Sequence, residues 1–268
     1  MEELVSDRST PILMDDCDDK GNWWKFVHPK SIDSDAIRIL TDSTCQPFGG
    51  DSEIGKWLHK LVKQCNVGTA IELGTYRGIT TERLTQIFPQ VIGMELKLSH
   101  FLYTWYTCAK CQNLKLFWGD SRNLLCPIME EASQQDLCFS KKYLLYIDSH
   151  WSSPEIPIIG EFDALKRLKR LNPDQCAFLI DDVCVPSDCD CLHYSCIPIR
   201  SSDPNSPFLD WEFIEPLLNS FYDSPEDYKV MWNNDTRIRP FPLAGSQKLP
   251  GKLIVVPKSW GDIDIDWP

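Results

Sequence analysis

The sequence predicts an α/β fold, a doubly wound and mostly parallel sheet of seven strands whose last strand runs antiparallel. Short apolar runs of strand length alternate with segments in which apolar residues recur at helical spacing. Strands that alternate with helices of this length form parallel βαβ units, which build a sheet covered on both faces. The last two strand-like runs are joined without an obvious crossover helix, which suits an antiparallel final strand.

The elements follow one another from residue 52 onward. In the first helix, Ile54, Trp57, Leu58 and Leu61 recur at the spacing of one helical face. The predicted helices occupy residues 52–64, 80–88, 99–111, 155–171 and 209–221. The predicted strands occupy residues 69–73, 91–95, 114–118, 143–148, 177–182, 228–232 and 252–256.

The predicted organisation is one domain preceded by an arm. Residues 1–50 are polar, acidic and rich in turn formers, which indicates an N-terminal arm with little regular structure. Residues 51–268 form the domain, which includes a cysteine-rich loop at residues 183–208.

Composition and charge narrow the class of protein. Hydrophobic residues make up 43% and charged residues 25% of the chain, as in ordinary globular proteins. A net charge of -12 argues against a nucleic-acid partner, because each phosphate contact needs a lysine or an arginine. No apolar run approaches a membrane span, and the acidic first twenty residues lack the pattern of a signal peptide. We therefore expect a cytoplasmic protein with no nucleic-acid or membrane partner, and a homo-oligomer stays open.

The cysteines have two candidate groupings. Without a signal peptide, the twelve cysteines are expected to be reduced thiols. The pair Cys108 and Cys111 falls on a predicted helix and is interpreted as core. A crowded set in the cysteine-rich loop comprises Cys184, Cys189, Cys191, His193 and Cys196. This spacing matches no common zinc module, so a zinc site and an incidental thiol-rich loop both stay open.

A glycine-rich turn separates the first predicted strand from the next helix. Between Gly74 and Gly78, backbone N–H groups and a helix N-terminus can approach a ligand closely. A dinucleotide-binding turn has the spacing Gly-x-Gly-x-x-Gly, and Tyr76 stands at its middle glycine. The turn therefore disfavours NAD and FAD.

Two acidic residues at later strand ends complete a predicted nucleoside site. Glu95 ends the second strand, where a carboxylate can accept both hydroxyls of a ribose. Asp120 follows the third strand and is placed to accept a hydrogen bond from an adenine amino group. Each feature alone is common, but the glycine turn and the two acids stand in order on successive strands, which favours a bound nucleoside.

These motifs resemble the class I methyltransferases, which have a Rossmann-like fold. The resemblance is carried by residues 71–78, 93–95, 119–120, 146–150 and 179–182. More narrowly, the chain resembles the small-molecule O-methyltransferases that include the macrolide sugar methylases, and the neighbouring cephalosporin hydroxylase-like family. The resemblance implies a site for S-adenosylmethionine formed by Glu72, Gly74, Gly78, Glu95 and Asp120. We add the adjoining Thr75 and Ser121 to this set.

Three carboxylates are predicted to meet at one edge of the sheet. Asp148 closes one strand and Asp181 and Asp182 close the next, so neighbouring strands would bring their ends to about 5 Å. Like charges this close repel each other unless a cation neutralises them or one carboxyl takes a proton. With no lysine or arginine nearby in the sequence, a hard divalent ion such as Mg²⁺ or Mn²⁺ is the expected partner. The resemblance implies the same three metal ligands.

The predicted catalytic residues are Asp148 and His150. His150 lies just past a strand end, where a neutral imidazole could take a proton from a substrate hydroxyl, although a loop carbonyl could equally satisfy it. The predicted function is metal-assisted methyl transfer from S-adenosylmethionine to a hydroxyl of a sugar or another natural product. Ser149 stands where sugar-methylating relatives often have glycine, so a hydroxylase-like tailoring protein stays open. A non-catalytic Rossmann-like binding protein is the second alternative.

Overall fold

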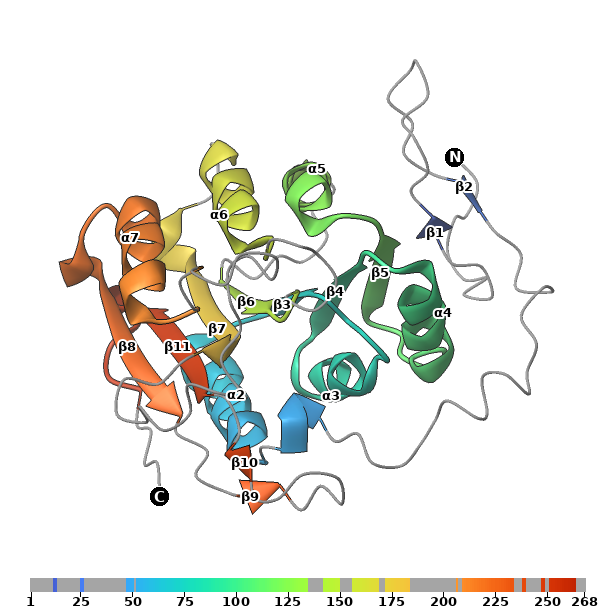
Figure 1. Cartoon of the computed structure of the whole chain (residues 1–268), viewed down its shortest axis with the longest axis horizontal. Helices are drawn as coiled ribbons and strands as arrows, with labels where there is room; N and C mark the ends of the chain where they lie inside the picture. Colours follow the sequence, from blue (N-terminus) through green and yellow to red (C-terminus); the bar gives the residue numbers. More distant parts are fainter. Residues whose placement is uncertain are drawn as a thin grey trace.

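The protein is described by a computed structural model at residues 12–13, 25–26, 47–50, 52–134, 142–149, 156–168, 172–183, 206, 209–233, 238–239, 247–248 and 251–263. Its centre is a sheet with the strand order β2-β1-β5-β4-β3-β6-β7-β11-β8 (Figure 1). The seven longer strands are β3 (Thr69–Leu73), β4 (Gln90–Glu95), β5 (Leu114–Trp118), β6 (Tyr143–Ile147), β7 (Cys176–Val183), β8 (Tyr228–Asn233) and β11 (Gly251–Pro257).

The last long strand, β11, lies between β7 and β8 and runs antiparallel to both. Strands β5, β4, β3, β6 and β7 are parallel to their neighbours. Numbered among the seven long strands, the order is 3-2-1-4-5-7-6 with the seventh antiparallel, which is the class I methyltransferase form of the Rossmann-like fold. The predicted fold is confirmed, and each predicted strand agrees with the structure to within one residue at either end.

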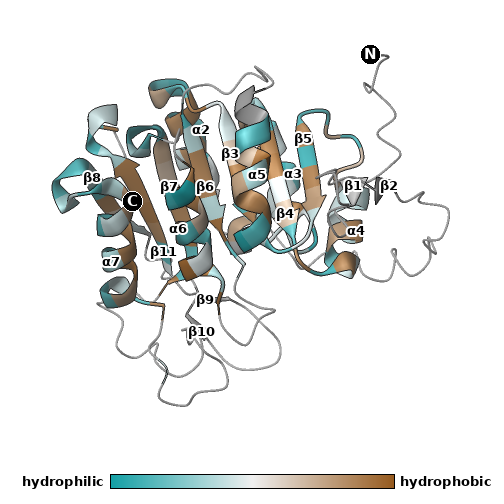
Figure 2. Ribbon diagram, turned by 90° about the horizontal axis from the view of Figure 1, so that it is seen from above, coloured by the Kyte–Doolittle hydropathy of each residue, from teal (hydrophilic) through white to brown (hydrophobic). Residues whose placement is uncertain are grey.

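Helices cover both faces of the sheet, so the central strands are buried on both sides. The helices are α2 (Ser52–Cys65), α3 (Ile79–Ile87), α4 (Leu98–Thr107), α5 (Ser121–Gln134), α6 (Ile158–Arg167) and α7 (Trp211–Tyr222). Figures 1 and 2 show α5, α6 and α7 on one face, and α2 and α3 on the other. Each face has its own apolar cluster, because alternate strand residues point to opposite faces.

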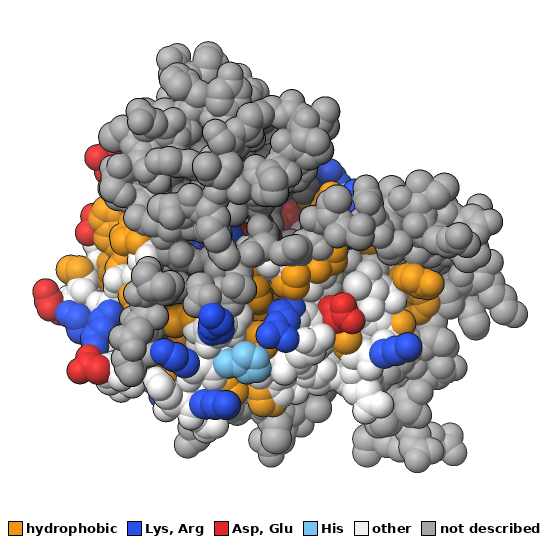
Figure 3. Space-filling view, turned by 90° about the horizontal axis from the view of Figure 1, so that it is seen from below, with side chains coloured by type: hydrophobic (Ala, Val, Ile, Leu, Met, Phe, Trp, Pro, Cys, Tyr) orange, Lys and Arg blue, Asp and Glu red, His pale blue; other side chains and the backbone are white. Residues whose placement is uncertain are grey.

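The first helix confirms its predicted apolar face. Ile54, Trp57, Leu58 and Leu61 are all buried against the sheet. The opposite side of α2 and the neighbouring α3 carry basic side chains, which gather around a histidine on the face seen in Figure 3. Burial, together with the charges of Arg83 and Lys63, lowers the pKa of His59, which lies on α2. The net negative charge of the chain is therefore not spread evenly over its surface.

The structure differs from the helix predictions at α4, α5 and α6, of which α6 (Ile158–Arg167) is shorter than the predicted 155–171. Helix α5 was not predicted, and it contains Pro127, a residue that usually indicates a break in a helical pattern. Helix α4 ends at Thr107, so the pair Cys108 and Cys111 lies in a turn after it, where the Cys111 N–H donates to the Cys108 carbonyl at 2.8 Å. The prediction that both cysteines lie on the helix is wrong, and only Cys108 is fully buried.

The described parts of the predicted N-terminal arm have regular structure. Strands β1 (Ile12–Leu13) and β2 (Lys25–Phe26) extend the sheet beside β5. A short 3-10 helix covers Pro47–Gly50, and the buried ring of Phe48 packs edge-on against Tyr146, with centroids 6.2 Å apart. The end of the arm is thus part of the domain core.

The remaining described elements are short. Strands β9 (Ile238–Arg239) and β10 (Gln247–Lys248) form an antiparallel pair, and further 3-10 helices cover Pro173–Gln175, Pro225–Asp227 and Lys258–Trp260. None of the helices in the described ranges has the length and apolar character needed to cross a membrane. The proposed zinc cluster of the cysteine-rich loop lies outside the described residues.

Candidate functional site

A pocket opens at the carboxyl ends of β3, β4, β5 and β6. Its volume is about 550 Å³, which is in the range of small-molecule sites. It is lined by Gly74, Tyr76, Met94, Glu95, Leu96, Lys97, His100, Gly119, Asp120, Ser121, Arg122, Asp148, Ser149 and Pro157. In open α/β sheets, ligands bind at this edge, because the loops that follow adjacent parallel strands meet there.

The glycine-rich turn after β3 is shaped by close approaches within the protein. Gly74 has a φ of +90°, and a side chain there would place its Cβ 2.8 Å from the carbonyl carbon of Asp148. Gly78 has a φ of +77°, and its Cβ would lie 2.7 Å from the Cα of Thr104. Both positions need glycine for conformation and for space. The turn therefore packs tightly between the end of β6 and helix α4.

Side chains of α4 hold the backbone of this turn. The Thr104 hydroxyl donates to the Tyr76 carbonyl at 3.0 Å, and the Thr107 hydroxyl donates to the Arg77 carbonyl at 3.1 Å. The hydroxyls of Thr75 and Thr104 also lie 2.9 Å apart in a buried contact. Thr75, a predicted cofactor residue, therefore faces α4 rather than the pocket.

Glu72 is also turned away from the pocket. It is buried beneath the turn, where the Thr81 hydroxyl donates to its Oε2 atom at 2.5 Å. Burial raises the pKa of Glu72 to about 8, so its carboxyl is largely protonated at neutral pH. Of the predicted cofactor residues, Gly74, Glu95, Asp120 and Ser121 line the pocket, whereas Glu72, Thr75 and Gly78 lie behind its wall.

Glu95 is fixed at the pocket wall by two backbone donors. Its Oε2 atom accepts the Tyr76 N–H and its Oε1 atom accepts the Lys97 N–H, each at 2.9 Å. Burial raises the pKa of Glu95 in spite of these bonds. The Leu96 N–H is a further backbone donor to this carboxyl, and the His100 Nδ1 atom lies 3.8 Å from Oε1. The half-exposed ring of Tyr76 lies edge-on to His100, with centroids 4.7 Å apart, and extends the wall beside Glu95.

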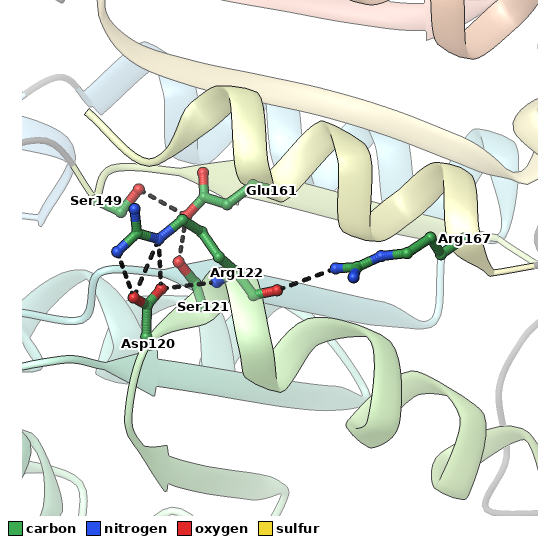
Figure 4. Close-up of polar contacts among 6 residues, drawn as sticks. All are labelled: Asp120, Ser121, Arg122, Ser149, Glu161 and Arg167. Carbon is green, nitrogen blue, oxygen red and sulfur yellow. Dashed lines mark hydrogen bonds and ion pairs between the residues drawn. The ribbon is translucent and has the colours of Figure 1, made fainter. Parts of the chain in front are cut away.

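Asp120 is paired with its neighbour Arg122. The Arg122 Nε atom lies 2.9 and 3.0 Å from the two carboxylate oxygens, and Nη2 lies 2.5 Å from Oδ2 (Figure 4). Although partial burial opposes ionisation, the guanidinium holds the pKa of Asp120 below its ordinary value. An adenine amino group would have to share these oxygens with Arg122.

Glu161 was not predicted, and it connects two loops of the pocket. It lies on α6, fully buried, and its Oε1 atom accepts the hydroxyls of Ser121 and of Ser149, the latter at 2.8 Å (Figure 4). No donor in the described part of the chain reaches its Oε2 atom. Burial raises the pKa of Glu161 to about 7. The signal in the sequence was an acidic residue on the apolar face of a helix, among Ile158 and Leu165.

The predicted aspartate cluster forms in part. β6 and β7 are neighbours, and the hydroxyl of Tyr146 lies between Asp148 and Asp181, 3.3 and 2.5 Å from their Oδ2 atoms. However, Lys252 on β11 forms a buried ion pair with the Oδ1 atom of Asp181. No lysine or arginine is near the aspartates in the sequence, but the inference that no side chain neutralises them is therefore wrong. It failed because Lys252 is 71 residues away in the sequence and comes close only through the antiparallel last strand.

The pKa values of Asp148 and Asp181 in this cluster are shifted in opposite directions. Burial and the charges of Asp181 and Asp182 raise the pKa of Asp148 well above its ordinary value. Burial also opposes ionisation of Asp181, but Lys252 and the hydrogen-bond donors around it hold the pKa of Asp181 below its ordinary value. Asp182 is half-buried, with a φ of +57°.

The described ranges contain no group of three His, Cys, Asp or Glu side chains placed to hold a metal ion. Asp148, Asp181 and Asp182 therefore do not form the predicted three-ligand set. His150 lies outside the described residues, so its role as a general base stays a prediction.

Comparison with known proteins gives structural similarity only. No family model matches the sequence, and no curated protein matches it. The O-methyltransferase TomG from Streptomyces achromogenes, involved in tomaymycin synthesis and solved in complex with SAM, is 15% identical over 84% of this chain and 88% of its own, with a TM-score of 0.47. The O-methyltransferase from Bacillus cereus, in complex with SAH, is 16% identical over 85% and 92%, with a TM-score of 0.46. Similarity at this level identifies neither a family nor a substrate.

Proposed function

We propose that this chain is an S-adenosylmethionine-dependent methyltransferase that binds its cofactor in the pocket at the carboxyl ends of β3 to β6. The observation that carries the proposal is the placement of Glu95, a buried carboxyl held by two backbone N–H groups beside the glycine-rich turn. A carboxylate fixed in this way suits the two hydroxyls of a ribose. Tyr76 stands where a dinucleotide-binding turn has its middle glycine, which argues against a dinucleotide ligand.

The other walls of the pocket also suit this cofactor. Asp148 and Glu95 supply carboxyl oxygens that can accept hydrogen bonds from hydroxyl and amino groups of the ligand. Ser121 and Ser149 present hydroxyl oxygens that the buried Glu161 holds in place. Tyr76 and His100 offer aromatic surface at the rim.

The reaction that we propose is transfer to a hydroxyl of a small molecule. The cofactor, when bound, supplies an electrophilic methyl group. The chain positions the cofactor through Glu95 and the loop after β5, so that an acceptor beside Asp148 lies in line with the methyl group. We propose His150 as the group that takes the acceptor's proton, because it follows Asp148 at the same strand end.

We leave metal assistance out of the proposal. Its premise was an uncompensated set of aspartates, and Lys252 already neutralises Asp181. A hydroxyl of a sugar or another natural product remains our proposal for the acceptor, as predicted from the resemblance.

Native mass spectrometry of the protein as purified tests the proposal. We expect a population whose added mass equals that of S-adenosylmethionine or S-adenosylhomocysteine, and we expect it to be lost in Glu95→Ala. A matched control, Glu82→Ala, removes an exposed acid from α3 and should keep the adduct. An adduct with the mass of NAD would contradict the proposal.

A further inference from the structure

We propose that Lys252 takes the place of a divalent cation in this site, so that Asp148 and Asp181 do not bind a metal. If the site transfers a methyl group, that transfer is metal-independent, and this part of the inference rests on the proposed function. The exclusion of the metal itself rests only on the residues around Asp181.

The topology brings Lys252 to the aspartates. Strand β11 enters between β7 and β8, and its pairing with β7 shifts register between Gly251 and Leu253. This places Lys252 beside Asp181 at the carboxyl edge of β7, on the face of the sheet that also carries Tyr146. Lys252 is 7% exposed.

Lys252 is the one basic side chain among the buried residues of the described ranges. The buried acidic residues in the same ranges are Glu72, Glu95, Glu161 and Asp181. A buried ammonium needs a partner, because an unpaired charge in an apolar interior is strongly unfavourable. The ion pair with Asp181 supplies that partner and balances the charge at the centre of the cluster.

The oxygens of Asp181 are already engaged. Oδ1 receives both the Lys252 ammonium and the Asp182 N–H, the latter at 2.8 Å. Oδ2 receives the Tyr146 hydroxyl at 2.5 Å. A carboxylate oxygen has about two acceptor positions, so both positions of Oδ1 are filled. A metal ion bound at Oδ1 would displace the ammonium and leave Lys252 buried without its partner.

The second carboxylate cannot form the site by itself. Asp148 lines the pocket, and the same Tyr146 hydroxyl lies 3.3 Å from its Oδ2 atom. A divalent ion in a protein usually takes several carboxylate oxygens, and Asp148 offers one carboxyl. The Lys252 side chain therefore competes with a cation for Asp181, the carboxylate that Asp148 would need as a co-ligand.

Electron paramagnetic resonance of Mn²⁺ titrated into the full chain, without any cofactor, tests this inference. The parent protein is expected to leave Mn²⁺ free at concentrations where Lys252→Met binds it, because the variant exposes two carboxylates with no cation between them. We expect the affinity for Mn²⁺ to rise by at least about tenfold in Lys252→Met. The control is Lys258→Met, which removes a lysine from the exposed ion pair with Glu226 and should bind Mn²⁺ like the parent.

Two results would overturn the inference. One is Mn²⁺ binding by the parent that disappears in Asp181→Asn. The other is a folded Lys252→Met variant that binds Mn²⁺ no better than the parent. If Lys252→Met does not fold, the parent and Asp181→Asn still decide the question. Because no cofactor is present, a failure here is distinct from a failure to bind S-adenosylmethionine.

Discussion

The hydroxyl of Tyr146 donates a hydrogen bond of 2.5 Å to the Oδ2 atom of Asp181. Both residues are buried, and the same hydroxyl lies 3.3 Å from Asp148. A phenol has a single proton, so it donates to one carboxyl at a time, and the shorter distance marks Asp181 as the acceptor. The raised pKa of Asp148 fits this arrangement, because a protonated Asp148 can itself donate to the phenol oxygen.

Tyr146→Phe should therefore destabilise the fold. The variant removes a buried hydrogen bond to a charged carboxylate, which should lower the free energy of unfolding by roughly 1.5 to 3 kcal/mol. Urea denaturation measures the difference. Tyr228→Phe is the matched control, because it removes a half-buried hydrogen bond to the neutral Asn219 and should cost about 1 kcal/mol or less. Equal losses in the two variants would argue against a special role for the Tyr146 contact.

The glycine turn allows a second prediction, on Gly74. Gly74→Ala should lower the free energy of unfolding by several kcal/mol, on the order of 3. The new Cβ would clash with the backbone of Asp148, and alanine is strained at the positive φ of this position. Gly261 has a φ of +80° and a ψ of -165° with nothing within 4 Å of a Cβ, so Gly261→Ala isolates the conformational cost and should lose less stability than Gly74→Ala. Thermal and urea unfolding compare the two variants. If both lose the same stability, the close approach to Asp148 does not matter.

Glu161 gives a prediction on pH dependence. In the folded protein the pKa of Glu161 is about 7, whereas in the unfolded chain its pKa is near the ordinary value of 4.5. The folded state therefore binds more protons in this interval, and the contribution of Glu161 to stability is lost as pH rises from 4.5 towards 7. Glu161→Gln does not titrate and keeps an acceptor for the two serines.

The measurement is the unfolding free energy of Glu161→Gln relative to the parent at several pH values. The difference should shift in favour of the variant by about 2 kcal/mol between roughly pH 5.5 and pH 8. The exposed Glu226 has a lowered pKa, so Glu226→Gln should show no such shift in this interval. A pH-independent difference for Glu161→Gln would mean that Glu161 is ionised throughout.

The strands and the edge of the site were predictable from the sequence because their signals are local. Three apolar runs predict the strands that lead to Gly74, Glu95 and Asp148. The carboxyl ends of these strands were predicted to lie at one edge of the sheet. The pocket does form at those ends. Local patterns carry such information because each βαβ unit is built from consecutive residues.

What the sequence did not reveal depends on contacts between distant residues. The pairing of Lys252 with Asp181 follows from the insertion of β11 between two other strands, which no local pattern encodes. In the same way, Glu161 meets Ser121 across 40 residues. Helix α5 was hidden for a different reason, because Pro127 interrupts its pattern although the helix continues.

Isothermal titration calorimetry with S-adenosylhomocysteine tests the central claim most directly. We expect micromolar affinity in the parent protein and no heat with NAD. In Glu95→Ala we expect affinity to fall about ten- to a hundredfold, because a hydrogen-bond acceptor for the ribose is lost, while Glu82→Ala binds like the parent. NAD binding without any response to S-adenosylhomocysteine, or full affinity in a folded Glu95→Ala variant, would contradict the account.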